Sequence, residues 1–466
     1  MSLSTLFTSS NRSGRFLRTL TTSYVLLGAA TIYSIGLVPL LLSHGGVSDL
    51  GLMNLVVQFT SYLSLVDAGL TSCSIRQFIG PLARGDTIAF SRQFKCALII
   101  SIFQGMIVAT VGFGGPLLAS WLRIPPDQIH LFSSLFLAQC FIVALGFPLR
   151  PLASVLLAKQ KFEITYLVQS IALLCSLALA WFGFSQNWGL WSVIVGNSLV
   201  FVLSSASLLI IGTRNGFLFL GFRGPPPSLR DVLAMLRDSS SFFSGPCIGT
   251  LSLVLQSSVL SRTLGLEGVA IWSVGSKVTS LLSQVLSKFF ESSFAGMSEL
   301  LELGQTQQML RRFAQILFSA TCLAFLLAAI VVLSNDWFVQ FWTNHLVDWP
   351  RICTIFVSIG LISTMLGKAF SEQAKVLLYW KSIQWGPFLD LLATSLLLIP
   401  VMFSPSLPLY SLALALSPLL GSLALNCRRV RSVMAESFIS HLSLSLQRAT
   451  WAALLFFILA ILWWLF

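Results

Sequence analysis

A regular series of polar side chains runs along an otherwise apolar segment of the chain, residues 267–290. Its members recur at intervals of three or four residues, and at 100° per residue this spacing keeps them on one narrow face of an α-helix. Such a face cannot lie against lipid, so it predicts contact with water, with a polar helix or with a ligand. The members are Ser273, Lys277, Ser280, Gln284, Lys288 and Glu291.

Lys277 is the member that carries the strongest physical constraint. It lies about ten residues from the outer end of the predicted helix, so roughly 15 Å deep at 1.5 Å per residue, near the middle of a bilayer. A cation at that depth costs about 3 kcal/mol or more unless water, an acid or an anionic ligand meets it. Either an ion pair with another helix or a water-filled cavity that binds an anionic group satisfies it, and the polar stripe favours the cavity.

The first half of the chain carries a matching polar face. Shifting the sequence by 219 residues places 46–54 over 265–273 and pairs identical residues further along, such as Thr60 with Thr279. Two such faces that line one central cavity would make it charged on one side and neutral on the other, which favours a substrate with one ionic end. The matching residues are Asn54, Gln58 and Ser61, at the positions of Ser273, Lys277 and Ser280.

Other ionisable residues have several interpretations each. Asp390 is the second deep charge, and it is a candidate for a coupling proton, for a pair with Lys277 or for a structural contact to a neighbouring helix. Asp67 lies opposite the polar face of its helix, so we expect it to pair with a basic residue within the first bundle. Three residues near the predicted inside ends either extend toward the headgroups or line an inner vestibule for a phosphate: Arg76, Arg150 and Lys368.

The composition requires a membrane around these residues. Hydrophobic side chains make up 56% of the 466 residues and charged ones 9%, far below the ~25% of soluble domains. A spanning helix needs about 20 mostly apolar residues. The pattern predicts an all-α polytopic protein whose thirteen spans lie near 20–43, 51–75, 96–121, 131–158, 164–184, 188–211, 239–261, 267–290, 313–335, 351–376, 382–403, 407–427 and 449–466.

The basic residues predict the orientation of these spans. The net charge is +12, and all but four of the 28 Lys and Arg residues fall in alternate loops or near the same ends of the spans. Because positive residues concentrate on the cytoplasmic side, the N-terminus is predicted inside and the C-terminus outside. Membrane topology therefore accounts for the basic charge, and no nucleic-acid partner is expected.

A proline-rich segment divides the chain. Residues 213–238 hold three consecutive prolines among four arginines, and this composition predicts a semi-rigid, non-helical cytoplasmic linker. We expect a six-helix bundle on each side, at 1–212 and 239–427, followed at 428–466 by a basic cytoplasmic loop and the thirteenth helix. The repeat offset covers an even number of spans, so the predicted pseudo-twofold axis runs along the membrane normal.

Catalytic and metal signatures are missing from the sequence. No HExxH, GxSxG or phosphate-binding loop is present, so no catalytic residue, enzymatic activity or cofactor is predicted. The eight cysteines stand singly, without zinc or disulfide spacing. Three histidines in predicted outside loops are interpreted as solvated, so we predict no metal site: His44, His130 and His345.

Three stretches resemble a known family. Residues 50–70 followed by Arg76, residues 158–162 and residues 264–272 are similar to the polysaccharide transporter family of the O-antigen flippase type. The resemblance implies the fold of the multidrug, oligosaccharidyl-lipid and polysaccharide exporter superfamily, in which two six-helix bundles form a MATE-like V around a central cavity.

The same resemblance implies a function. It is that of a flippase in the bacterial inner membrane, which moves undecaprenyl-diphosphate-linked oligosaccharide outward by alternating access for lipopolysaccharide or other surface polysaccharide synthesis. The expected partners are the lipid-linked oligosaccharide, membrane lipids, and the glycan polymerase and chain-length machinery, and we expect a monomer.

Two other functions are compatible with parts of the pattern. A cation-coupled multidrug exporter of the same superfamily predicts acids rather than lysines in the cavity. A polytopic polysaccharide polymerase or ligase needs a large external loop with acceptor-binding groups, whereas the longest predicted outside stretch, 335–350, is short and contains no arginine.

Overall fold

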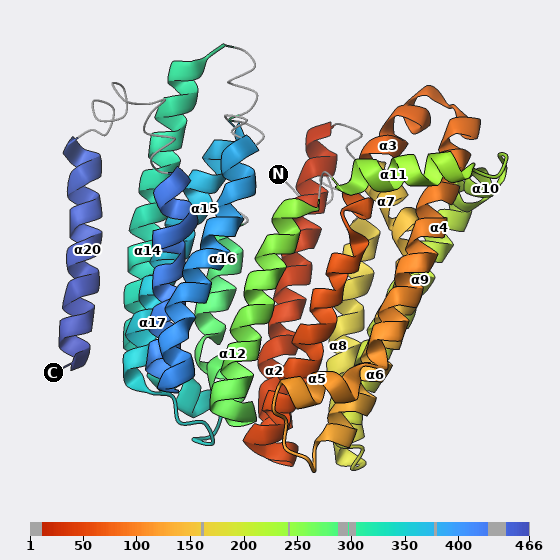
Figure 1. Cartoon of the computed structure of the whole chain (residues 1–466). Coiled ribbons are helices and arrows are strands. Elements are labelled where there is room, and N and C mark those ends of the chain that lie inside the picture. Colours follow the sequence, from red (N-terminus) through yellow and green to blue (C-terminus); the bar gives the residue numbers. More distant parts are fainter. Residues whose placement is uncertain are drawn as a thin grey trace. The chain divides into compact units, whose positions relative to one another are not determined.

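Two compact helical units make up the protein (Figure 1). A computed structural model describes residues 12–159, 163–240, 243–287, 297, 304–376, 380–426 and 444–465. Every regular element in these residues is helical, and the units comprise Met1–Pro246 and Cys247–Phe466. The prediction of an all-α membrane protein is confirmed.

The count of spans differs from the predicted thirteen. Nine helices of the described residues are long and apolar enough to cross a membrane, and a tenth is added if the bent pair 247–275 and 277–287 forms one span. The difference arises where predicted spans are joined into one long helix and at the C-terminal end, where only the short stretch Thr450–Leu462 is apolar enough.

Two long helices are each interrupted by a glycine at equivalent positions of the repeat. Helix α2 (Arg12–Tyr62) contains Gly46 at φ 75°, ψ −170°, and α12 (Ser244–Gly275) contains Gly265 at φ 69°, ψ −168°. These two glycines are separated by the same 219 residues as the sequence repeat. The 47-residue segment Thr21–Asp67 would extend ~70 Å as one helix, more than twice the hydrocarbon thickness, so the break at Gly46 is needed within it.

Alanine at either glycine is expected to destabilise its unit, because this backbone region is accessible to glycine almost alone and costs other residues about 1–3 kcal/mol. Thermal unfolding in detergent should show similar losses for Gly46→Ala and Gly265→Ala. Gly28→Ala and Gly249→Ala are matched controls, since a Cβ at either helical position meets open space. A loss at only one of the two break positions would contradict their equivalence.

The first unit packs its long helices through small residues. Helix α4 lies against α6, where a Cβ at Gly105 would come within 2.7 Å of the Ala144 carbonyl oxygen, and α8 lies against α9 and α2. The close approach of backbones at glycine is typical of membrane helices. The elements after α2 are η1 (Leu63–Asp67), α3 (Leu70–Arg84), α4 (Thr87–Gly112), α5 (Gly115–Trp121), α6 (Ile129–Gly146), η2 (Phe147–Leu149), α7 (Arg150–Ala158), α8 (Glu163–Ser185), α9 (Trp191–Arg214), α10 (Phe217–Phe222) and α11 (Leu229–Ser240).

The second unit is built around α15, which packs on α14 and α17. The C-terminal helix α20 lies along α14, where Phe457 and Ala460 join a buried apolar cluster. The elements after α12 are helix 277–287, α14 (Thr306–Trp342), α15 (Arg351–Val376), α16 (Trp380–Phe403), α17 (Leu407–Pro418), the π-helical turn η3 (Leu419–Leu423) and α20 (Leu444–Leu465).

The linker prediction was wrong about helix content. Within 213–238, helix α10 precedes the prolines and most of α11 follows them, so only 215–216 and 223–228 lie outside helices. Ser228 and Asp231 form a capping box, in which the Ser228 amide donates to the Asp231 carboxylate (2.8 Å) and the Asp231 amide to Ser228 Oγ (3.3 Å). The prolines therefore end before the helix begins, and the Ser-x-x-Asp spacing was the signal for that start.

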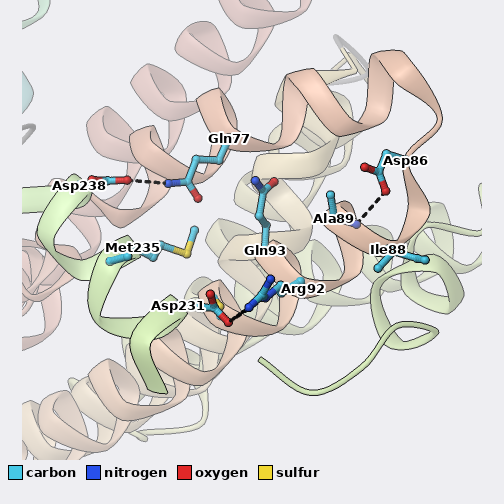
Figure 2. Close-up of a pocket in the computed structure, with 11 residues that line it drawn as sticks. Gln77, Asp86, Ile88, Ala89, Arg92, Gln93, Asp231, Met235 and Asp238 are labelled. Atoms are coloured by element: carbon cyan, nitrogen blue, oxygen red, sulfur yellow. Dashed lines mark hydrogen bonds and ion pairs between the residues drawn. The ribbon is translucent and has the colours of Figure 1, made fainter. Parts of the chain in front are cut away.

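Helix α11 is fastened to α3 and α4 around a cavity of about 650 Å³, which is lined by charged, amide and apolar side chains (Figure 2). Arg92 of α4 pairs with Asp231 at 2.6 Å, and Gln77 of α3 donates to Asp238 at 3.3 Å. Hydrogen bonds from Ser228, assisted by Arg92, lower the pKa of Asp231 below its ordinary value. The carboxylate consequently stays charged, and the contact stays formed, until the pH falls through this lowered pKa.

Candidate functional site

The helix that carries Lys277 is broken immediately before it. Helix α12 ends at Gly275, the next helix covers 277–287, and the two axes differ by 49°. The sequence prediction of one straight helix over 267–290 was therefore wrong. Ser273 lies before the break, and Lys277, Ser280 and Gln284 lie after it.

Buried groups of the second unit stabilise this break. The Asn335 side-chain amide, which is fully buried, donates to the Gly275 carbonyl oxygen at 3.1 Å. The Trp349 indole lies over Gly275, where any Cβ would come within 2.0 Å of it. Trp349 Nε1 in turn donates to Thr354 Oγ1 at 2.8 Å, and that hydroxyl donates to Asp336 at 2.7 Å. Only glycine fits at the end of α12, and the carbonyl freed by the break has a partner.

Lys277 opens the helix after the break and is half-buried. Among the described residues, no carboxylate forms an ion pair with it. Ser280 and Gln284 follow on exposed positions, and Ser273 is half-buried with its hydroxyl donating to the Ala270 carbonyl (2.8 Å). The predicted members Lys288 and Glu291 lie outside the described residues.

Of the three alternatives for Asp390, the described residues show a structural contact to a neighbouring element and no pair with Lys277. Asp390 lies in α16, where its Oδ1 accepts a hydrogen bond from the Ser422 amide at 2.7 Å. That amide belongs to the π-helical turn η3, in which Gly421 departs from helical geometry. The Asp390 carboxylate therefore satisfies a backbone group that the irregular turn leaves open, and a role in proton coupling stays a prediction.

The matching residues of the first half lie on the second part of α2. Asn54 and Gln58 are half-buried, and Ser61 is exposed with its hydroxyl donating to the Gln58 carbonyl at 2.6 Å. Their meeting with the Lys277 helix across a central cavity stays a prediction, because they belong to different units.

Asp67 and Arg150 form the main ion pair of the first unit. Arg150 Nη1 lies 2.8 Å from Asp67 Oδ1, and the guanidinium lies 3.7 Å above the centre of the Phe147 ring. The Thr71 amide (3.1 Å) and hydroxyl (2.8 Å) also donate to the carboxylate, and Gln104 donates to the Asp67 carbonyl at 3.0 Å. The expected pairing of Asp67 within the first bundle is confirmed.

The vestibule candidates have different surroundings. Arg150 has the structural partner just described, Arg76 is exposed on α3, and Lys368 is half-buried on α15. Their contact with a phosphate stays a prediction. Within the described residues, no group of three or more His, Cys, Asp or Glu side chains is placed to hold a metal ion.

A cavity beside the broken helix is the feature that the sequence analysis missed. It measures about 210 Å³, lies within the second unit between helix 277–287, α15 and α17, and shares Ser280 with the polar stripe. Three of its other hydroxyl groups recur at Ser276, Thr279 and Ser283, on a neighbouring helix face. This spacing was visible in the sequence, but only the break and the packing of α15 and α17 show that these groups share one space.

A comparison with protein families shows where the chain belongs. Residues 21–300 match the family described as "Polysaccharide biosynthesis protein". The chain is a member of that family. The match covers more than half of the chain, including the first unit from residue 21 onward and the broken helix, so the resemblance stated from the sequence is confirmed. No curated protein sequence matches the chain significantly.

Solved structures show the same fold at low identity. The structure of the lipid II flippase MurJ in an inward closed conformation is 15% identical, with a TM-score of 0.65, and the alignment covers 96% of this chain and 98% of that one. The eukaryotic MATE transporter AtDTX14 is 15% identical with a TM-score of 0.60, covering 94% and 99%. A mutant of the Vibrio cholerae MATE transporter VcmN is 15% identical with a TM-score of 0.58, covering 96% and 97%.

These similarities establish the architecture. The chain has a MATE- and MurJ-like transporter fold, and it is a multi-pass membrane protein of a polysaccharide biosynthesis family.

Proposed function

We propose that this protein is a flippase for a lipid-linked oligosaccharide, in which undecaprenyl diphosphate is the lipid carrier and the product is used for surface polysaccharide. The family supports the glycan part of this proposal, and the likeness to a lipid II flippase supports the lipid part. The observation that carries it is Lys277, a half-buried cation at a helix break, with no acidic partner among the described residues.

A lipid diphosphate must move its charge across ~30 Å of hydrocarbon. A cation on the transport path offsets part of that cost, and a single lysine can release the group that it binds. Broken helices commonly form the binding sites of secondary transporters, because the freed backbone groups and the change of direction create a polar site within the membrane. In this mechanism the lipid tail stays in the bilayer while two six-helix bundles rock about the linker.

Transport in vesicles tests the proposal directly. The purified protein is reconstituted into liposomes whose inner leaflet holds undecaprenyl diphosphate with a fluorescent oligosaccharide, and an added glycosidase reports the molecules that reach the outer leaflet. We expect cleavage to rise with protein content. Vesicles that contain the protein but show the protein-free rate would contradict the proposal.

The proposed topology has thirteen spans, with the N-terminus inside and the C-terminus outside. Thirteen crossings result if the parts of α2 before and after Gly46 count as two, the parts of 244–287 before and after Gly265 also count as two, and α20 is the last. Reporter fusions or cysteine labelling at Gly224 and Phe466 should place these two positions on opposite sides of the membrane. If both lie in the cytoplasm, α20 does not span and lies along the interface instead.

A further inference from the structure

The cavity beside the broken helix has an uncharged, hydroxyl-rich wall. Helix α12, helix 277–287 with the residue before it, α15 and α17 line it, and among the described lining residues none is ionisable. The hydroxyl groups come from helix 277–287 and the residue before it, from α15 and from α17. They belong to Ser276, Thr279, Ser280, Ser283, Thr364 and Ser411.

Several of these hydroxyl groups have no protein partner. In apolar helices a serine or threonine hydroxyl commonly donates to a carbonyl one turn earlier, as those of Ser358 and Ser395 do here. Within the described residues, the hydroxyls of Ser280, Ser283 and Thr364 form no such bond, and Ser280 and Thr364 are exposed. They are available to donate to and accept from a ligand in the cavity.

Aromatic rings complete the wall. Trp272 and Phe356 line the cavity next to the free hydroxyl groups. The Tyr410 ring meets Trp272 edge-on at 5.0 Å between centroids, and the Tyr410 hydroxyl donates to the Gln256 carbonyl at 3.3 Å. The indole is thus held in a fixed orientation by its neighbours, as a preformed binding surface requires.

We propose that this cavity binds one neutral sugar ring, the sugar adjacent to the diphosphate, and this proposal rests on the proposed function. A sugar ring presents hydroxyl groups at its edge and apolar C–H groups on its faces, which match free hydroxyls and a fixed indole. The space is that of roughly seven water molecules at about 30 Å³ each, enough for one ring and too small for an oligosaccharide.

The position of Lys277 supports this assignment. Residues three apart on a helix are neighbours at about 5–6 Å, so Ser280 lies beside Lys277 while also lining the cavity. A diphosphate bound by Lys277 would place its attached sugar at Ser280 and Ser283. The two groups of the substrate then occupy adjacent faces of one helix.

Removing free hydroxyls that lie only in the sugar subsite tests the proposal. The double variant Ser283→Ala, Thr364→Val keeps the shape of the wall. In vesicles we expect it to transport undecaprenyl diphosphate carrying one N-acetylhexosamine about tenfold more slowly at low substrate concentration. Transport of sugar-free undecaprenyl diphosphate should be unchanged. Thr321→Val, whose hydroxyl bonds to the Leu317 carbonyl on α14, is the matched control.

Equal rates for both substrates in the double variant and the parent would overturn the subsite, and so would equal losses for both. A second measurement does not require transport. Labelling of Ser283→Cys by a small thiol reagent, followed by peptide mass spectrometry, should be slowed by the sugar-bearing lipid and not by the sugar-free lipid. If the sugar-bearing lipid slows labelling but no transport occurs, the sugar subsite is supported and the flippase function is contradicted. If transport occurs but labelling is not slowed, the flippase function is supported and the sugar subsite is contradicted.

Discussion

Replacing Lys277 with alanine is expected to abolish export of the surface glycan in cells that depend on this protein, with normal amounts of protein in the membrane. The reason is electrostatic. A cation within the bilayer offsets part of the cost of carrying a diphosphate through hydrocarbon, and an effect of about 3 kcal/mol corresponds to a loss of roughly 100-fold or more in rate. Glycan immunoblots measure export in cells, and the vesicle assay measures the transport rate. Quantification of the protein in membranes shows whether its amount is normal.

Charge-reversing and charge-keeping variants sharpen the test. Lys277→Glu should also be inactive because it repels the diphosphate, and Lys277→Arg should retain part of the activity because it keeps the charge with a different shape. Lys159→Ala is the matched control. Lys159 follows the last residue of α7 in the first unit, and its ammonium group donates to the Leu82 carbonyl of α3. This substitution should leave export close to normal.

Asp390 distinguishes the flippase from a drug exporter. Asp390→Asn keeps an oxygen that can accept the hydrogen bond of the Ser422 amide, so the structure predicts little change in export. If Lys277→Ala exports normally while Asp390→Asn is inactive, and transport of a cationic drug follows the pH gradient, the flippase mechanism fails. The cation-coupled multidrug exporter then takes its place.

Much of the fold could be predicted from the sequence because it depends on local rules. Long apolar runs predict helices, and the weak 219-residue repeat predicted equivalence of the halves at the level of the second span. The backbone bears this out at one exact feature, since Gly46 and Gly265 share an unusual conformation. The Asp67 pair was also predicted in outline, because a carboxylate on an apolar face needs a cation.

The helix break could not be predicted from the local pattern. Residues 267–290 are as apolar and as periodic as an intact helix, and the break at Ser276 depends on Asn335 and Trp349, which lie far away in the sequence. The hydroxyl cavity has the same origin, because it exists only where α15 and α17 pack against the redirected helix. Periodicity identifies a polar face but not the partner that it meets.

The linker shows a different failure. Its proline content outweighed a capping signal that was present a few residues later, so α11 was missed. The ion pair between Arg92 and Asp231 that fastens α11 joins residues 139 positions apart. Composition describes an average over a segment, whereas a helix start depends on the order of two or three residues.

Breaking the ion pair between Asp67 and Arg150 is expected to give the largest loss of stability. The Asp67 and Arg150 side chains are only 16% and 28% exposed, and removing either partner leaves a largely buried charge uncompensated. A cost of about 2 kcal/mol or more is expected for Asp67→Asn or Arg150→Ala. Thermal unfolding in detergent, followed by fluorescence, should show the first unit losing structure at a lower temperature.

Asp67 also stabilises a turn of the backbone. Loss of this ion pair should therefore have a larger effect on stability than loss of a surface ion pair. Asp67 directly precedes Ala68 and Gly69, both at positive φ, where the chain turns from η1 into α3. Its carboxylate receives the Thr71 amide as well as Arg150, so Asp67→Asn weakens the turn and the pair together. Asp231→Asn, which removes the charge that pairs with the 51% exposed side chain of Arg92, is the control and should change thermal unfolding little. If Asp67→Asn and Asp231→Asn lower the unfolding temperature equally, the ion pair between Asp67 and Arg150 contributes no more than a surface contact. The turn from η1 into α3 is then not stabilised by this pair.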